Sequence, residues 1–569
     1  MRFSFFLHAH LPWVLTHGRW PHGAEWLCEA ALETYIPLLD RLRRLGRRGV
    51  RGGVTLGVSP VLAEQLAAPA FRKIFREFLD ERIRTSRDDE DRRTEFAQVA
   101  RGWRQHYEHA RAIFYDELQG DLLGAFRALE DEGVLEIATC GATHGYLPLL
   151  GRDESIALQI ELACRVHERH FGRAPRGIWL PEAAYRPGGP WRARREGSDA
   201  RWRPGVEEFL ASAGIEYFIV DSSLLERGTA PVVPGSNWGA VARKPAPRSA
   251  PSAPSRDTRR SYWASRDFGR EPSVAFFVRD PRTAVQVWSG DEGYPGDSVY
   301  LEFHKKSETG GHRYWRITGA QVDLGVKAVY DCPSAKERAR AHAEHFRDLI
   351  ASAAQDAPDD GIVTAPFDAE LFGHWWFEGI DWLEHVLTLL HEDARVELTT
   401  LGRHVHAYPP TTATRLPEGS WGAGGGHDVW MNPQVSWSWD TIHRCEDLVF
   451  GLWSRARQSH DPWVRRAAIA AARQLLILSA SDWQFLVTTG TAADYAVTRL
   501  RRHARDVERL VGIAEHALGT GVTPLEDRDF VDRTDSRDPL FPELETALDA
   551  AMYAGAPSLA GPRSPAARE

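Results

Sequence analysis

Seven short apolar runs, each followed by polar residues and then by a helical pattern, recur through the first 400 residues. They are Arg2–Leu7, Gly53–Leu56, Leu135–Thr139, Gly177–Leu180, Tyr217–Val220, Val274–Val278 and Ile362–Thr364. Alternation of strand and helix is typical of a parallel sheet. We therefore predict an α/β fold built on a (β/α)7 barrel, closed or incomplete, with its mouth formed by the residues that follow the strands.

The rest of the chain divides by composition. Residues 71–130 are highly charged and helical in pattern, too long for one crossover, and predict a helical insertion within the 1–400 barrel. Residues 227–262 include the Pro/Ser-rich segment Ser249–Arg260 and predict a flexible loop. Three helical stretches at about 440–458, 463–480 and 494–517 predict an all-helical C-terminal domain over 401–525. The remaining 526–569 is expected to be a partly disordered tail.

Carboxyl groups follow two of the predicted strands. Glu182 comes directly after the strand that ends in Trp179-Leu180, and Asp368 follows Ile362–Thr364. Asp368 is preferred to Glu370 because it lies nearer the end of the strand. Two carboxyl groups at the mouth of one barrel suit glycoside cleavage, in which one attacks carbon or activates water and the other protonates the leaving oxygen. The alternative for Glu182 is a surface residue that caps the next helix.

Three histidines also lie at predicted strand ends. His8 and His10 point the same way if the first strand is extended, and His144 follows the third strand. Imidazoles from neighbouring strands can bind a tetrahedral metal ion, as in a metal-dependent deacetylase or amidohydrolase. Since no acidic ligand accompanies the first pair, hydrogen bonding to hydroxyl or carboxyl groups is the preferred interpretation, with no metal.

Composition narrows the class of protein. With 70 Lys and Arg against 79 Asp and Glu, the net charge is −9, which argues against nucleic acid as a partner. Five scattered Cys without CxxC spacing indicate a reducing compartment, and the chain lacks a signal peptide pattern and a 20-residue apolar span, so we expect a cytoplasmic protein without membrane contact. Many of the 21 Trp stand beside Gly, Pro, Asp or His, which is typical of sugar stacking, although a large core would also use them.

Five ordered motifs give the chain a family resemblance. HAHLPW, CGATHGYLPLL, GIWLPEAAY, TAPFDAELFGHWWFEG and the later WSWDTIHRCEDLVF with SASDWQFL resemble the signature regions of glycoside hydrolase family 57, particularly its 1,4-α-glucan branching enzymes. The resemblance runs from Phe3 to about Leu518. It implies a (β/α)7 barrel with a helical insertion, a helical domain that closes the cleft, and a retaining mechanism without metal or cofactor.

The resemblance also assigns residues. Glu182 falls on the nucleophile and Asp368 on the general acid/base of the family. The residues expected to bind α-glucan are His10, His144, Arg279, Trp288, Gly296, Trp421, Trp430 and Asp482. The implied protein is a branching enzyme of glycogen synthesis that acts on an α-glucan as a monomer or small homo-oligomer.

The chain departs from the family pattern in one loop. Branching enzymes of the family have a tyrosine at the tip of the loop after the fifth strand, whereas this chain has no Tyr between Arg227 and Ser261. We hypothesise that Trp238 or Tyr262 substitutes for it. An α-amylase, a 4-α-glucanotransferase or a weakly active glucan-binding protein therefore stay open as alternatives.

Overall fold

The fold is centred on a curled sheet of parallel strands in the computed structural model, which describes residues 1–569 except 20, 93, 193–199, 230–255, 266–273, 290–291, 320 and 555–569. Seven parallel strands follow one another in the order β10 (Ile362–Asp368), β1 (Arg2–Ala9), β2 (Val54–Val58), β3 (Glu136–Cys140), β4 (Gly177–Trp179), β7 (Tyr217–Val220) and β9 (Ala275–Val278). They coincide with the seven predicted strands. Between β9 and β10 the described residues form one isolated bridge, from Arg279 to Thr364. The prediction of an incomplete (β/α)7 barrel is confirmed.

Short strands extend the edge of the sheet. β8 (Tyr262–Ala264) runs antiparallel to β9, β12 (Ala413–Thr414) pairs with β8, and β11 (Glu397–Leu398) pairs with β1. A separate hairpin consists of β5 (Gly189–Trp191) and β6 (Arg201–Arg203). Because β12 belongs to the sheet, the barrel extends beyond the expected boundary at residue 400.

Strand alternation separates the barrel interior from its helical coat. On β1, Phe3 and Phe5 belong to the large core beneath the helices, whereas Phe6 belongs to a second cluster with Trp179 and Phe277 inside the barrel. α14 (Leu401–Ala407) contributes to the same inner cluster. The same alternation carries His8 of β1 to the inner face, beyond Phe6 and toward the mouth.

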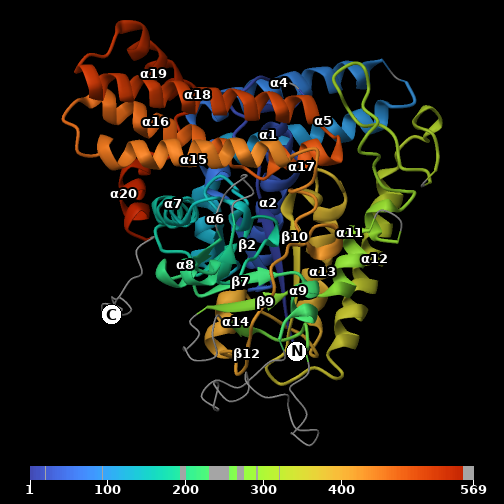
Figure 1. The fold of residues 1–569 in the computed structure, drawn as a ribbon. Coiled ribbons are helices and arrows are strands. Elements are labelled where there is room, and N and C mark those ends of the chain that lie inside the picture. The colour runs from blue at the N-terminus through green and yellow to red at the C-terminus, as the bar shows by residue number, and fades with distance from the viewer. Residues whose placement is uncertain are drawn as a thin grey trace, which may run out of the picture.

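Helices cover the outside of the sheet (Figure 1). Those that follow barrel strands are α1 (Ala24–Ala30), the π-helix η1 (Ala31–Tyr35), α2 (Ile36–Arg47), α3 (Pro60–Ala67), α7 (Asp153–Phe171), α8 (Val206–Ser212), α9 (Ser222–Arg227), α11 (Pro281–Trp288), α12 (Cys332–Ala353) and α13 (Gly379–Glu392). Between β2 and β3 lie α4 (Pro69–Asp91), α5 (Ala97–Arg111), η2 (Ala112–Glu117) and α6 (Leu122–Asp131). They occupy the predicted helical insertion, and α4 buries Phe71, Phe75 and Phe78 while most of its charged residues face outward.

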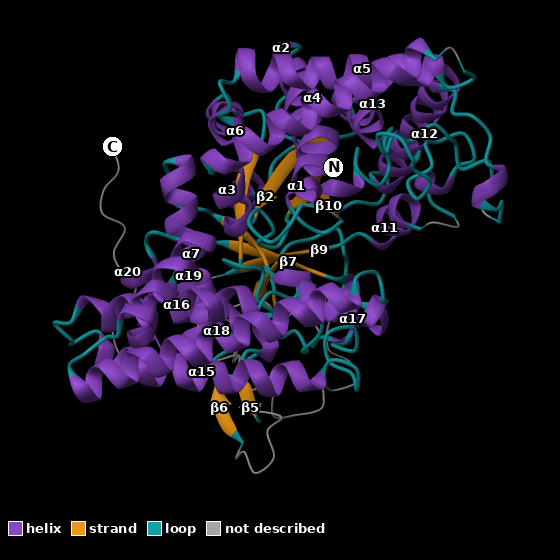
Figure 2. Ribbon diagram, turned by 90° about the horizontal axis from the view of Figure 1, so that it is seen from above, coloured by secondary structure: helices purple, strands orange, loops and turns teal. Residues whose placement is uncertain are grey.

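A layer of long helices crosses one side of the barrel, opposite α4 and α5 (Figure 2). It consists of α15 (Ser436–Ala456), α16 (Pro462–Leu478), α18 (Ala493–Thr520) and α19 (Leu525–Arg537), with the short α17 (Asp482–Thr489). The last helix, α20 (Leu544–Ala554), packs against α7 of the barrel. No helix in the described ranges combines the length and apolar composition needed to span a membrane.

The expected tail, residues 526–569, is predicted to be disordered only from Ala554 onward, and the structure places two helices in the part up to that residue. Residues 526–554 form most of α19 and all of α20, and Val531 and Leu544 are buried. Buried Asp538 between the two helices accepts a hydrogen bond from Trp13 Nε1 at 2.9 Å and contacts His17 Nε2 at 2.6 Å. These partners are more than 500 residues away, so local composition does not reveal them. Residues 555–569 of the expected tail lie outside the described part of the chain.

Candidate functional site

The two carboxyl groups selected from the sequence lie at the mouth of the barrel. Glu182 follows β4 in a short 3-10 turn (Pro181–Ala183), and Asp368 is the last residue of β10, in register with His8 of β1. Six non-glycine residues of the described chain have positive φ, and His144, Glu182 and Ala183 are three of them. Such strained backbone is concentrated where a site fixes a side chain in one position. Here it turns His144 and Glu182 out of their strands and into the mouth.

Hydrogen bonds hold the Glu182 carboxylate from two directions. Trp421 Nε1 donates to Oε2 at 3.0 Å, and Ser481 Oγ donates to Oε1 at 2.8 Å. Burial raises the pKa of Glu182 to about 7, although both hydrogen bonds act to lower it. Because a hydrogen bond to the charged form favours ionisation, Trp421 and Ser481 keep a buried carboxyl group partly ionised near neutral pH.

Asp368 has a different electrostatic environment. Burial raises its pKa well above the ordinary value, and the nearby carboxyl groups of Glu370, Glu182 and Asp482 raise it further, whereas Arg279 lowers it. Asp368 therefore holds a proton under conditions in which Glu182 is substantially ionised. A pair of carboxyl groups separated in this way provides one acid and one nucleophile or base.

Glu370 supports the site from behind. The chain turns in a 3-10 helix, η7 (Ala369–Leu371), directly after Asp368. Glu370 Oε1 accepts hydrogen bonds from Tyr35 Oη at 2.5 Å and from the His10 backbone N–H at 3.0 Å. Its contacts fix the start of the loop and the His10 backbone, which agrees with the choice of Asp368 as the reacting group.

The three histidines form a stack beside Glu182. The rings of His10 and His144 are 3.9 Å apart and nearly parallel, and those of His8 and His144 are 5.0 Å apart. His144 Nδ1 lies 2.8 Å from Ser481 Oγ and 3.8 Å from Glu182 Oε1. His10 Nε2 lies 3.1 Å from Asp482 Oδ2. The stack thus joins two strands of the barrel to the C-terminal helices.

These residues are also the ones that could hold a metal ion. Ligand atoms of His10, His144 and Asp482 lie within 4.8 Å of one another, as do those of His8, Cys140 and His144. Each nitrogen of His144 already has a partner, since Nε2 lies 2.9 Å from His8 Nε2 and Nδ1 contacts Ser481. A metal would have to displace one of these contacts, and the hydrogen-bonded alternative from the sequence describes the observed geometry.

Two segments far along the chain complete the mouth. The α16–α17 connection docks on the loop after β3, where Ala480 bridges Gly145 and the Ser481 N–H donates to the His144 carbonyl oxygen at 2.9 Å. The segment before α15 docks beside Glu182 through the bridge between Gly419 and Tyr185. Ser481, Asp482 and Trp421 therefore reach the barrel from outside it.

Aromatic side chains line one rim of the site. The rings of Trp288 and Trp421 are 6.5 Å apart, and those of Trp288 and Trp375 are 6.3 Å apart. Trp288 is 46% exposed and Trp375 37% exposed. The Arg279 guanidinium lies 5.6 Å from the Trp421 ring and donates to Asp221 Oδ2 at 3.4 Å. Exposed rings beside a buried acid pair suit a ligand with apolar C–H faces.

Two other residues predicted to bind α-glucan, Trp430 and Gly296, do not present an exposed side chain to the cleft. Trp430 is buried, with 1% exposure, and its ring packs against Tyr146, so a contact of Trp430 with glucan stays a prediction. Gly296 ends a short turn, η5 (Tyr294–Gly296), in which Tyr294 packs against α12 through His345. A glucan contact of Gly296 would involve its backbone and stays a prediction.

The structure describes only one of the two residues proposed to replace the loop tyrosine. Tyr262 is buried in β8, where its ring stacks on Phe276 and its hydroxyl donates to the Asp257 carbonyl oxygen, so it does not serve as a mobile tip. Trp238 lies outside the described residues.

Sequence reasoning missed Ser481, Trp375 and Asp221 as site residues. Ser481 directly precedes Asp482 in SASDWQFL, Trp375 lies in the loop after Asp368, and Asp221 follows the strand Tyr217–Val220. Position at a strand end was the available signal for Asp221. No spacing in the sequence relates Ser481 to Glu182, 299 residues away.

Comparisons with known proteins agree with this geometry. A family model described as glycosyl hydrolase family 57 matches residues 4–417, and one described as 1,4-alpha-glucan branching enzyme, C-terminal, matches 441–548. The 1,4-alpha-glucan branching enzyme of Thermococcus kodakarensis is 43% identical over 512 residues, which are 89% of this chain and 73% of that protein. A probable 1,4-alpha-glucan branching enzyme of Mycobacterium tuberculosis is 30% identical over 535 residues, or 90% and 91% of the two chains.

Solved structures are similar over nearly the whole chain. The crystal structure of a GH57-type branching enzyme from Pyrococcus horikoshii has a TM-score of 0.86 and 39% identity, with 96% of both chains covered. The α-amylase AmyC from Thermotoga maritima has a TM-score of 0.78 and 27% identity, with 96% of this chain and 99% of that chain covered.

Proposed function

Since the chain belongs to glycoside hydrolase family 57, we propose that it is a retaining 1,4-α-glucan branching enzyme, with Glu182 as nucleophile and Asp368 as general acid/base. The observation that carries the assignment is the difference between the two carboxyl groups. Glu182 accepts hydrogen bonds from Trp421 and Ser481, whereas burial and neighbouring carboxylates keep Asp368 protonated. The match of the C-terminal helices to a branching-enzyme model supports branching in particular.

The reaction follows from these charges. Glu182 attacks the anomeric carbon of an α-1,4-linked glucan while Asp368 transfers its proton to the departing oxygen, which leaves a glycosyl ester on Glu182 and a carboxylate on Asp368. Asp368 then takes a proton from the 6-hydroxyl of a second glucan segment. That oxygen attacks the anomeric carbon, displaces Glu182 and forms an α-1,6 branch with net retention.

The acceptor decides between branching and the alternatives. Water would give an amylase, and a 4-hydroxyl would give a 4-α-glucanotransferase. AmyC, an α-amylase, shares the fold, so the fold does not determine the acceptor. The exposed rings of Trp288 and Trp375 support transfer because they offer a sugar acceptor an apolar surface beside the acid pair.

Incubation of the purified protein with amylose tests the proposal. Proton NMR would measure α-1,6 linkages, and a reducing-end assay would measure hydrolysis. We expect branch signals with few new reducing ends, and loss of both in Glu182→Gln. Reducing ends without branches would make the protein a hydrolase. In a separate test, activity should be undiminished by a chelator if the histidine stack acts without metal.

We place the reaction in glycogen synthesis in the cytoplasm, carried out by a monomer or small homo-oligomer. The five cysteines are free thiols, which supports a reducing compartment. Size-exclusion chromatography with light scattering would measure the oligomeric state.

A further inference from the structure

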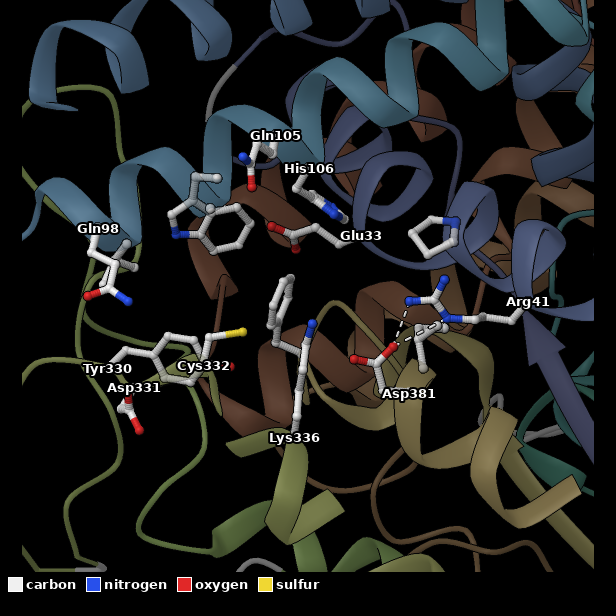
Figure 3. Close-up of a pocket in the computed structure, with 16 residues that line it drawn as sticks. Glu33, Arg41, Gln98, Gln105, His106, Tyr330, Asp331, Cys332, Lys336 and Asp381 are labelled. Carbon is white, nitrogen blue, oxygen red and sulfur yellow. Dashed lines mark hydrogen bonds and ion pairs between the residues drawn. The ribbon is translucent and has the colours of Figure 1, made fainter. Parts of the chain in front are cut away.

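A second cavity opens away from the catalytic carboxyl groups, between α5 and the first turns of α12 and α13 (Figure 3). Its volume is about 280 Å³, and none of the residues assigned to the catalytic site lines it. Small-molecule sites usually have volumes of ~300–1,000 Å³, so this cavity suits one or two sugar rings. Trp103 and Phe377 contribute aromatic surface to its wall, and Gln98 and Gln105 contribute amides.

The charges of the wall are largely paired within the protein. Glu33 bonds to Arg313 at 2.5 Å and to His374 Nδ1 at 2.6 Å. Burial acts to raise the pKa of Glu33, but Arg313 and His374 outweigh it and lower the pKa to about 2. Arg41 donates to Asp381 at 2.6 Å. Figure 3 shows the Arg41–Asp381 pair facing the cavity across from Glu33. In the buried part of the cavity a charged ligand would have to compete with these ion pairs, so that part favours a neutral ligand. The exposed Lys336 and Asp331 also line the cavity.

His106 supplies an unused hydrogen-bonding group. Among the described residues, its buried Nε2 has no partner. Burial lowers the pKa of His106 to about 4, so the ring is neutral near pH 7. A buried polar atom without a protein partner is usually satisfied by a water molecule or a ligand. A hydroxyl group satisfies either tautomer of a neutral imidazole because it both donates and accepts, whereas a carboxylate only accepts.

We propose that this cavity is a second binding site for a neutral sugar, with one or two glucose units of an α-glucan against Trp103, Phe377 and His106. The identification of the sugar as glucose rests on the proposed function. The loop of residues 374–377 lies between the two sites, since Phe377 lines the cavity and the Trp375 ring contacts Trp288 at the cleft. One glucan molecule can therefore be held on both sides of that loop.

Cys332 at the cavity provides a local readout. It lines the cavity and is exposed, whereas Cys28, Cys140 and Cys445 are buried. The rate of its modification by N-ethylmaleimide would be measured by peptide mass spectrometry at increasing maltotriose concentration, in the Glu182→Gln protein so that the sugar is not consumed. We expect maltotriose to slow the labelling of Cys332 severalfold, and glycerol at equal concentration to have no effect.

Two variants test whether the protection of Cys332 comes from sugar bound in the cavity. His106→Leu removes the unused nitrogen, and we expect half-protection to need about tenfold more maltotriose, the loss equivalent to one hydrogen bond. Gly102 of α5 lines the cavity and has open space around it, so Gly102→Trp should fill the cavity and abolish protection by sugar. The control is Gly512→Trp, because Gly512 is also an exposed helical glycine with open space around it.

The outcomes are decisive in both directions. Protection that is lost in Gly102→Trp and weakened in His106→Leu, but kept in Gly512→Trp, supports the second site. Labelling that maltotriose does not slow up to about 100 mM, where a site of millimolar Kd is filled, overturns it. Protection unchanged by both cavity variants also overturns it. The assay needs no turnover, so its failure is separate from a failure to form α-1,6 linkages.

Discussion

The ends of β4 and β10 each present a carboxyl group to the same cleft, but different parts of the chain control them. Glu182 at the end of β4 is bonded by Trp421 and Ser481, which reach it from the segments before α15 and before α17. Asp368 at the end of β10 is influenced by burial, by Glu370 in the next turn and by Arg279 at the end of β9. The C-terminal segments therefore favour ionisation of Glu182, the proposed nucleophile, whereas Asp368, the proposed acid, is influenced mainly by burial and by groups of the barrel, with Asp482 of α17 as a further contributor.

This difference predicts two separate limbs in the pH profile. As pH falls through about 7, Glu182 gains a proton and loses its nucleophilic form, so the rate should fall. As pH rises through the elevated pKa of Asp368, the acid loses its proton and the rate should fall again. Substitutions near one carboxyl group should move one limb and leave the other in place.

The largest effect should come from the carboxyl groups themselves. We expect Glu182→Ala and Asp368→Ala each to lower kcat by at least ~10²–10⁴-fold, the usual contribution of a positioned acid or base. Azide separates the roles, because it would replace the missing nucleophile and give a β-glycosyl azide in Glu182→Ala, but trap the glycosyl enzyme as the α-azide in Asp368→Ala. NMR of the products measures the configuration, and the opposite pairing would reverse our assignment.

Loss of the Trp421 hydrogen bond should have the next largest effect. Trp421→Phe keeps an aromatic ring but removes the N–H that lowers the pKa of Glu182, so the acid limb should move up by about one pH unit and kcat/KM at pH 7 should fall about fivefold. The control is Trp430→Phe, since Trp430 Nε1 has no partner among the described residues. An acid limb that stays in place in Trp421→Phe would contradict control by the C-terminal segment.

Truncation of the aromatic rim should act on binding. Trp288→Ala removes a ring that is 46% exposed, and we expect KM for amylose to rise about 2–10-fold with little change in either pH limb. Trp202→Ala, at an exposed Trp on the β5–β6 hairpin, is the matched control and should leave KM unchanged. Equal effects in the two variants would argue against a binding role for this rim.

The smallest shift should follow from Arg279→Gln. The Arg279 charge lowers the pKa of Asp368, so its removal should move the alkaline limb up by less than about one pH unit without moving the acid limb. Arg282→Gln, a nearby exposed arginine, should change neither limb. A downward shift of the alkaline limb in Arg279→Gln would show that another group controls Asp368.

The strands were predictable because buried parallel strands are short apolar runs bounded by polar residues, and all seven lie where the pattern placed them. The helical insertion and the C-terminal helices were predictable from long amphipathic stretches. The tail was not. α19 has few buried residues, and Asp538 joins it to Trp13 and His17, so its position depends on partners that its own sequence does not display.

The proposed catalytic pair was predictable from position, since Glu182 and Asp368 lie at the ends of strands that meet at the mouth. Their supporting groups were only partly predictable. Trp430 and Trp421 both stand in a Gly-rich segment, yet the former packs against Tyr146 and the latter against Glu182. A tryptophan in a loop can stack on a sugar or fill a core, and composition does not separate the two.

By itself the sequence determined the barrel, its strand ends and the position of the two candidate carboxyl groups, because these depend on short-range periodicity and on a strand direction shared by the whole sheet. The tertiary structure decided the protonation of those groups, the presence of Ser481 in the site, the hydrogen bond from Trp421 to Glu182, and the cavity beside His106. Protonation depends on burial and on charges a few ångströms away, and those neighbours come from segments hundreds of residues apart.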